Sequence, residues 1–75
     1  MEITQTVFVT LDSTSLAGAA YDSQSLTLSL LFHNGAIYSY SGVQPGVYQE
    51  LLVAPSKGTY FHHSIRSRFT FNRIR

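Results

Sequence analysis

Cysteine and tryptophan are absent from this 75-residue chain. Without cysteine there is no disulfide and no thiolate ligand for a metal, and the composition fits a reducing compartment such as the cytoplasm. No segment approaches the roughly 18 consecutive apolar residues of a membrane span. The first ten residues hold one acid and no lysine or arginine, so we expect no signal peptide. These absences predict a soluble cytoplasmic protein.

Positive charge is missing from residues 1–56, which contain all four acids of the chain. Residues 57–75 contain all five lysines and arginines and no acid. The basic residues are mostly arginine, whose forked guanidinium suits phosphate and carboxylate groups. This asymmetry predicts a basic face for an anion. The alternative is that the two parts fold together and their charges offset each other.

The length allows one domain, spanning residues 1–75, with a thin stability margin. A chain of this size buries only about 60% of the surface that it exposes when unfolded. Self-association would supplement so small a core, so we expect a homo-oligomer.

Alternating hydrophobicity predicts a small antiparallel sheet. The clearest case is a strand in which Leu26, Leu28 and Leu30 alternate with polar residues. Further strands are expected over residues 3–11, 16–21 and 36–41, and from about Phe69 onward. Between the third and fourth strands, Asn34-Gly35 predicts a hairpin with a type I′ turn, in which both central residues have positive φ.

Two short helices are expected between the fourth and fifth strands. Pro45 suits a first helical turn, and an apolar stripe of Val47, Tyr48, Leu51 and Leu52 follows it. Pro55 ends this helix, and Ser56 caps a second one that runs to about Ile65. The fold class is therefore α+β, with about five antiparallel strands and two short helices packed against them.

Neither catalysis nor metal binding is indicated. The chain has no nucleophile-elbow motif, and its four carboxylates lie far apart in sequence. His62 and His63 are adjacent, so on a helix they point about 100° apart and do not share one face. We expect no enzymatic activity, no cofactor and no metal.

The segment Ser56-Lys57-Gly58 is a candidate anion site. A helix N-terminus presents free N–H groups and a partial positive charge, Lys57 adds a full charge, and Gly58 would allow a ligand close to the backbone. The alternative is a capped helix with a solvated lysine. The glycines of a P-loop are missing.

Aromatic residues offer stacking surfaces. Tyr38 and Tyr40 share one face of the fourth strand, where they would either stack on bases or cover the sheet beneath a helix. Tyr60 has the same two interpretations. The complete set of candidate ligand-binding residues is Tyr38, Tyr40, Ser56, Lys57, Gly58, Tyr60, His62, Arg66, Arg68 and Arg73.

Several short motifs follow one another in a recognisable order: Tyr21-Asp22, Asn34-Gly35, Ile37-Tyr38-Ser39-Tyr40, Gly42-Val43, Val47-Tyr48, Leu51, Ala54-Pro55-Ser56-Lys57-Gly58, Tyr60-Phe61 and Ile65-Arg66. Over residues 12–74 this order resembles the KTSC domain, a small module named for the C-terminus of certain lysyl-tRNA synthetases. The resemblance implies a stand-alone bacterial or phage form, with RNA binding suggested and no enzymatic activity established. The chain departs from the family in its additional strand over residues 3–11, in Pro55 and in His62-His63.

Three functions follow as hypotheses. The first is non-enzymatic binding of a small or cyclic signalling nucleotide between subunits, which in a phage would sequester a host defence signal. The second is RNA binding, with the basic residues in one groove and Tyr38 or Tyr60 stacking on bases, although the total charge is modest. The third is a structural or protein-interaction module that uses the edge of the strand over residues 3–11.

Overall fold

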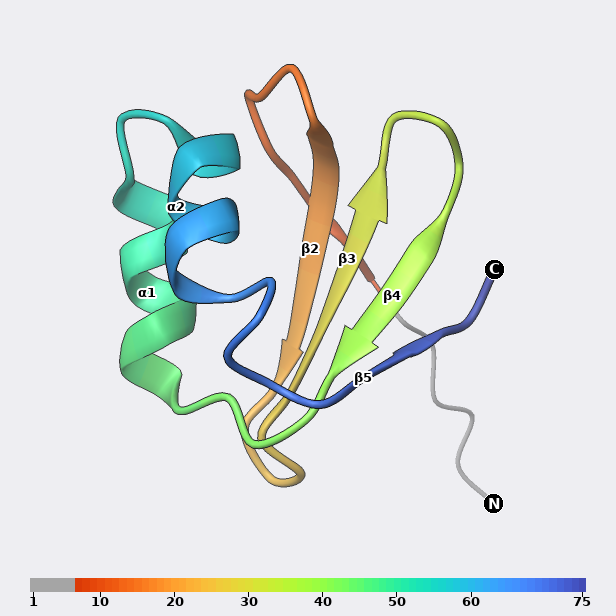
Figure 1. The fold of residues 1–75 in the computed structure, drawn as a ribbon, viewed down its shortest axis with the longest axis vertical. Coiled ribbons are helices and arrows are strands. Elements are labelled where there is room, and N and C mark those ends of the chain that lie inside the picture. The colour runs from red at the N-terminus through yellow and green to blue at the C-terminus, as the bar shows by residue number, and fades with distance from the viewer. Residues whose placement is uncertain (1–6) are drawn as a thin grey trace.

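The computed structural model describes residues 7–75, which form one sheet and two helices (Figure 1). The strands are β1 (Val9–Thr10), β2 (Leu16–Asp22), β3 (Thr27–Phe32), β4 (Ile37–Tyr40) and β5 (Phe71–Arg73), and the helices are α1 (Pro45–Val53) and α2 (Lys57–Ser64). The strands lie side by side in chain order, and each adjacent pair is antiparallel. The predicted α+β class is confirmed.

Both helices begin where the sequence predicts. Pro45 is the first residue of α1, and the Ser56 side chain accepts a hydrogen bond from the Thr59 N–H at 3.3 Å at the start of α2. Tyr48 attaches α1 to the sheet by stacking on Tyr21 of β2, with ring centroids 4.9 Å apart. Within residues 7–75 neither helix is long and apolar enough to cross a membrane.

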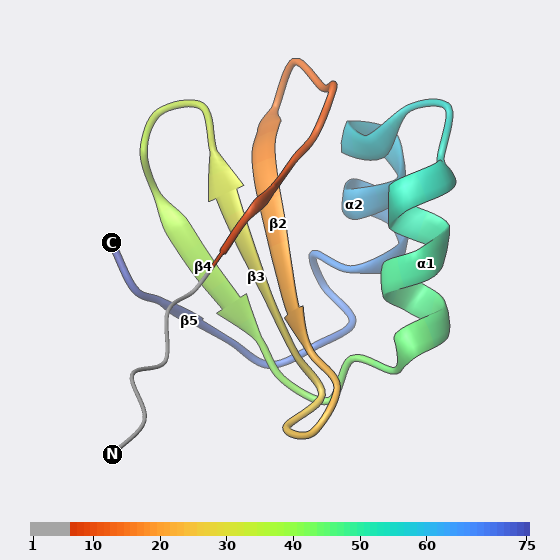
Figure 2. The same ribbon diagram turned by 180° about the vertical axis from the view of Figure 1, so that it is seen from behind.

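The hydrophobic core lies between β2, β3 and the helices. Leu28 and Leu30 of β3 point toward the helices and are fully buried. The other core residues are Leu11, Leu16, Ala19, Tyr40, Val43, Leu51, Phe61 and Ile65. Figures 1 and 2 show α1 and α2 gathered on the β2 side, so that β4 and β5 extend beyond them.

The predicted hairpin after β3 is present, but its predicted turn type is wrong. Among residues 7–75 the only non-glycine residue with positive φ is Leu26, so Asn34 does not have the conformation that a type I′ turn needs. Within this turn Gly35 is the left-handed residue, at φ 91°, and its N–H donates to the Phe32 carbonyl at 2.9 Å. The Asn34 side chain accepts from the Ala36 N–H at 3.0 Å, which stabilises a three-residue loop closed by glycine.

The predicted first strand is represented by β1, which is shorter than residues 3–11; residues 3–6 lie outside the described part. Phe8 crosses closely over Gly18 of β2, where an added Cβ would lie 3.1 Å from the Phe8 Cβ. The register also shifts between Leu16 and Gly18. The absence of a side chain at Gly18 therefore allows the close approach of Phe8 beside an irregular stretch of β2.

Candidate functional site: an aromatic groove beside the second helix

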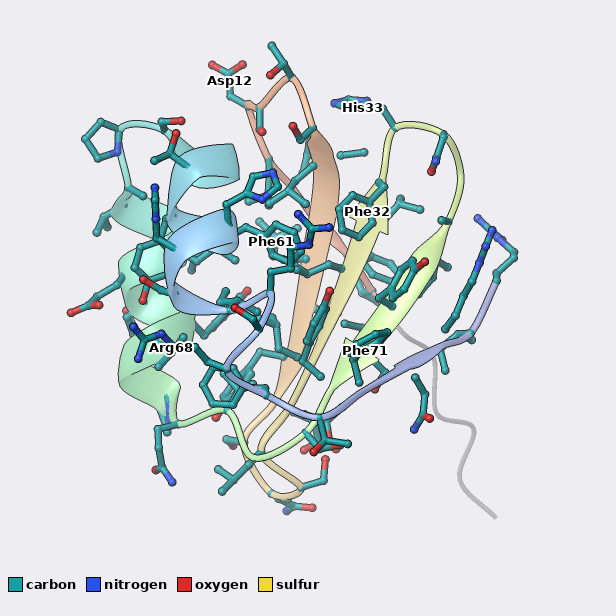
Figure 3. All side chains as sticks on the ribbon, viewed as in Figure 1. Asp12, Phe32, His33, Phe61, Arg68 and Phe71 are labelled. Atoms are coloured by element: carbon teal, nitrogen blue, oxygen red, sulfur yellow. The ribbon has the colours of Figure 1, made fainter. Side chains whose placement is uncertain are left out.

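A groove of about 730 Å³ lies where β4 and β5 extend beyond α2. Five aromatic residues line it, and we call them the aromatic floor: Phe32, Tyr38, Tyr40, Phe61 and Phe71. Figure 3 shows Phe32, Phe61 and Phe71 on the same side of the sheet. The volume falls within the range of about 300–1,000 Å³ that is usual for small-molecule sites.

Strand register places these rings together. Tyr40 of β4 lies opposite Phe71 of β5, and directly opposite residues in antiparallel strands point to the same face. Their ring centroids are 5.8 Å apart. Phe61 reaches the floor from α2, with its ring edge-to-face against Tyr40 at 5.9 Å and against Phe32 at 5.5 Å.

The rings of the aromatic floor differ in how much of their surface is exposed to solvent. Tyr40 is 3% exposed, whereas Phe71 is 50% exposed. Burial raises the pKa of Tyr40, the nearby Tyr38 adds to the increase, and Arg66 opposes it. The two tyrosines therefore differ in position: Tyr40 belongs to the core, and the partly buried Tyr38 lines the groove.

Basic and polar side chains surround the floor, and we call them the rim: Asn34, His62, Arg66, Ser67 and Arg73. Arg66 Nη1 lies 3.3 Å from His62 Nδ1. Because arginine can only donate, His62 Nδ1 is the acceptor, and the neutral ring then carries its proton on Nε2. The Arg73 guanidinium lies over the Tyr38 ring, 5.9 Å from its centroid.

No carboxylate lines this groove among residues 7–75. Two guanidinium groups beside open aromatic rings favour a ligand that combines a flat ring with a negative charge. Two of the five basic residues from the C-terminal part of the chain, Arg66 and Arg73, thus line the groove.

The segment Ser56-Lys57-Gly58 lies elsewhere, at the N-terminal end of α2. It lines a smaller pocket of about 330 Å³ that also contains Asp12. Lys57 Nζ donates to the Ala54 carbonyl at 3.1 Å. A Cβ added to Gly58 would lie 3.4 Å from Ser15 Oγ, so the turn before β2 occupies the close approach that we predicted for a ligand.

Tyr60 and Arg68 are placed outside the groove as well. The Tyr60 hydroxyl donates to Glu50 Oε1 at 2.9 Å, and the pKa of Tyr60 is raised by burial and by that bond. Arg68 Nε donates to the His63 carbonyl at 3.3 Å, and Figure 3 shows Arg68 away from Phe71. The groove therefore brings together half of the predicted candidates: Tyr38, Tyr40, His62, Arg66 and Arg73.

Sequence reasoning did not include Phe32 or Phe71 among the site residues. Their signal was the two-residue alternation, because Phe32 follows Leu28 and Leu30 on the inner face, and Phe71 shares its face with Arg73. His33 belongs to neither pocket; its Nε2 donates to the Ser13 carbonyl at 2.7 Å. The part of the chain covered by the structure contains no group of three residues that would hold a metal.

Comparison with known proteins shows two kinds of relatives. The chain is 41% identical over 54 residues to a lysine–tRNA ligase of Trichormus variabilis, covering 72% of this chain and 10% of the ligase. It is 36% identical over 55 residues to the corresponding ligase of Nostoc punctiforme, covering 73% and 10%. An uncharacterized protein of Stutzerimonas stutzeri is 43% identical over 54 residues, covering 72% of this chain and 76% of that protein.

The crystal structure of a KTSC domain protein from Yersinia pestis has the same fold. It superimposes with a TM-score of 0.87 at 26% identity, covering 95% of this chain and all of that one. The family model of the KTSC domain matches residues 12–69 of this chain. The chain therefore belongs to the KTSC domain family.

Proposed function

We propose that this domain is a non-enzymatic binding module for a nucleotide-type anion, a small or cyclic signalling nucleotide. The observation that carries the proposal is the groove itself, which combines an aromatic floor with two arginines and, among residues 7–75, no carboxylate. A nucleotide has the matching chemistry, because its base stacks on aromatic rings and its phosphate accepts from guanidinium groups.

In this proposal the aromatic floor would bind the base and the basic side chains of the rim would bind the phosphate. Phe71 is the most exposed ring of the floor and offers its surface to a base, with Tyr38 beside it. Arg66 and His62 Nε2–H would donate to the phosphate from the α2 side, and Arg73 from the β5 side. Each charge-assisted bond contributes about 1.5–3 kcal/mol and a stacked base about 1–3 kcal/mol. One protomer would thus bind with a Kd between about millimolar and about micromolar.

Tighter binding needs the groove to be closed from outside. A second copy of the chain would supply the missing wall, which places the ligand between subunits. Binding without turnover in the cytoplasm would remove a signalling nucleotide from solution. In a phage, this would sequester a host defence signal.

RNA is the second candidate ligand. Two of the relatives are lysine–tRNA ligases, whose names identify tRNA as a substrate of those proteins. Unpaired bases would stack along Tyr38 and Phe71, with the phosphates at Arg66 and Arg73. Because Arg66 and Arg73 are the only arginines that line the groove within residues 7–75, each protomer would contact few phosphates, and its RNA affinity would depend only weakly on salt.

A matched pair of variants tests the site. Arg66 and Arg68 are both exposed and lie two positions apart, but only Arg66 lines the groove. Arg66→Ala should weaken nucleotide binding about 10-fold or more, whereas Arg68→Ala should bind like the unchanged protein. Calorimetric titration with mono-, di- and cyclic nucleotides and with a single-stranded RNA would measure both.

The same titrations separate the two ligands. Saturation by a cyclic or short nucleotide, with a raised melting temperature, supports the small-ligand proposal. Binding of RNA alone supports the second candidate. Equal losses in Arg66→Ala and Arg68→Ala, or no binding of any nucleotide or RNA, would overturn the groove as the site.

A further inference from the structure

The strand β5 is the open edge of the sheet next to the groove. Within residues 7–75 the strand order ends at β5, and its three residues are all exposed. The Ser41 N–H donates to the Thr70 carbonyl at 2.9 Å, and the Ile74 N–H donates to the Ile37 carbonyl at 2.7 Å. Because bonding direction alternates along an antiparallel strand, Thr70, Asn72 and Ile74 face β4 while Phe71 and Arg73 direct their backbone groups outward.

We infer that a second copy of the chain pairs with this edge, β5 against β5, and joins two grooves into one site. A two-fold axis at Asn72 places Phe71 of one copy opposite Arg73 of the other. These are the residues whose backbone N–H and C=O groups point outward, so each such pair exchanges two hydrogen bonds. The two sheets then become continuous, with both aromatic floors on one face.

The partner contributes to each groove in this arrangement. Phe71 and Arg73 already line the groove of their own protomer. Opposite residues share a face, so the partner's Arg73 comes beside Phe71, where a guanidinium packs favourably on an aromatic ring. The partner's Phe71 and the partner's Arg73 would thus form the wall that a single protomer lacks.

Charge links this pairing to the ligand. Arg73 and the partner's Arg73 become diagonal neighbours, with Cα atoms about 7–8 Å apart. In each copy, the residues from 7 to 75 that line the groove include no carboxylate to neutralise them. Basic residues on an edge strand oppose pairing, and a bound anion would remove that repulsion. Dimerisation should therefore strengthen when an anionic nucleotide binds. This last step rests on the proposed function, whereas the edge pairing does not.

Single cysteines test the register directly, because the chain has none of its own. In Asn72→Cys the two cysteines would form a non-hydrogen-bonded pair with Cα atoms about 4.5 Å apart, within the range for a disulfide. In Thr70→Cys, also exposed, they would be offset by four residues, about 14 Å along the strands, which is too far. After mild oxidation, Asn72→Cys should give on the order of tenfold more covalent dimer than Thr70→Cys.

A mixing experiment provides the second measurement. Thr70 lies opposite the partner's Ile74 in this register, so an equal mixture of Thr70→Cys and Ile74→Cys should form a mixed disulfide that neither variant forms alone. Equal cross-linking of Asn72→Cys and Thr70→Cys, or no mixed disulfide, would overturn the β5 pairing. Cross-linking without nucleotide binding would overturn the proposed function alone, and nucleotide binding without cross-linking would overturn the pairing alone.

Discussion

The sheet face toward the helices is built differently in its two halves. Over β2 and β3 it presents aliphatic side chains, and Leu16, Leu28 and Leu30 have no exposed surface. Over β4 and β5 it presents tyrosine, phenylalanine and arginine, with exposure increasing to 50% at Phe71. The helices cover the first half and leave the second open (Figures 1 and 2).

The difference follows from the chemistry of the side chains. A leucine in water has no polar group to solvate, so it contributes to stability only where a helix covers it. Tyrosine has a large apolar ring and a polar tip, and arginine stacks on rings while its charge stays hydrated. The covered half should therefore determine stability, and the open half should determine binding.

The largest expected effect comes from the covered half. Leu30→Ala removes a fully buried side chain and should lower the free energy of unfolding by about 2–5 kcal/mol, a large part of the stability of so small a domain. Urea denaturation followed by circular dichroism would measure it. Val53→Ala is the control, because Val53 is 78% exposed and should change stability by no more than about 0.5 kcal/mol. Equal losses of stability in Leu30→Ala and Val53→Ala would contradict the conclusion that the covered half determines stability.

In the open half, Tyr38→Ala should affect binding more than folding. Removing the ring takes away a stacking surface worth about 1–3 kcal/mol, so nucleotide affinity should fall about 5- to 150-fold. Tyr38→Phe keeps the ring and should bind almost normally. If the phenylalanine variant also lost affinity, the tyrosine hydroxyl and not its ring surface would be the important group.

Alkaline pH tests the boundary between the halves. The pKa of Tyr40 is raised above its ordinary value of 10.0, chiefly by burial, so the folded protein holds this proton more tightly than the unfolded chain does. Stability is therefore intact below pH 10 and falls as the pH rises above it. Melting temperatures between pH 8 and 11 should decline less steeply in Tyr40→Phe. An unchanged decline would assign the effect to other tyrosines.

The smallest effect is expected at the far end of α2. Lys57→Ala removes a bond to the Ala54 carbonyl at a pocket separate from the aromatic groove, so nucleotide affinity should not change. Isothermal titration of this variant checks the expectation. A loss of nucleotide affinity as large as that expected for Arg66→Ala would show that the N-terminus of α2 is part of the binding site.

Local patterns were sufficient to predict the fold. Leucine alternation predicted β3, Pro45 and Ser56 predicted the helix starts, and all three are confirmed. The turn type failed because Asn-Gly fits two loop geometries, and the Asn34 side-chain bond to Ala36 favours the longer one.

Only half of the candidate site could be predicted, because a site depends on contacts between distant segments. Lys57, Gly58 and Arg66 are candidates that lie close together in sequence, but Lys57 and Gly58 line the pocket at the start of α2 and Arg66 lines the groove. Phe32 joins Arg66 only through the register of β2, β3 and β4 and the packing of Phe61. Sequence spacing does not contain that information.

The most direct test of the groove is a titration with cyclic mono- and dinucleotides followed by two-dimensional ¹H–¹⁵N NMR. We predict that the amide signals of Tyr38, Arg66, Phe71 and Arg73 shift progressively with ligand, while those around Lys57 stay in place. Shifts centred on Lys57 and Gly58, or no shifts with any nucleotide, would contradict the account.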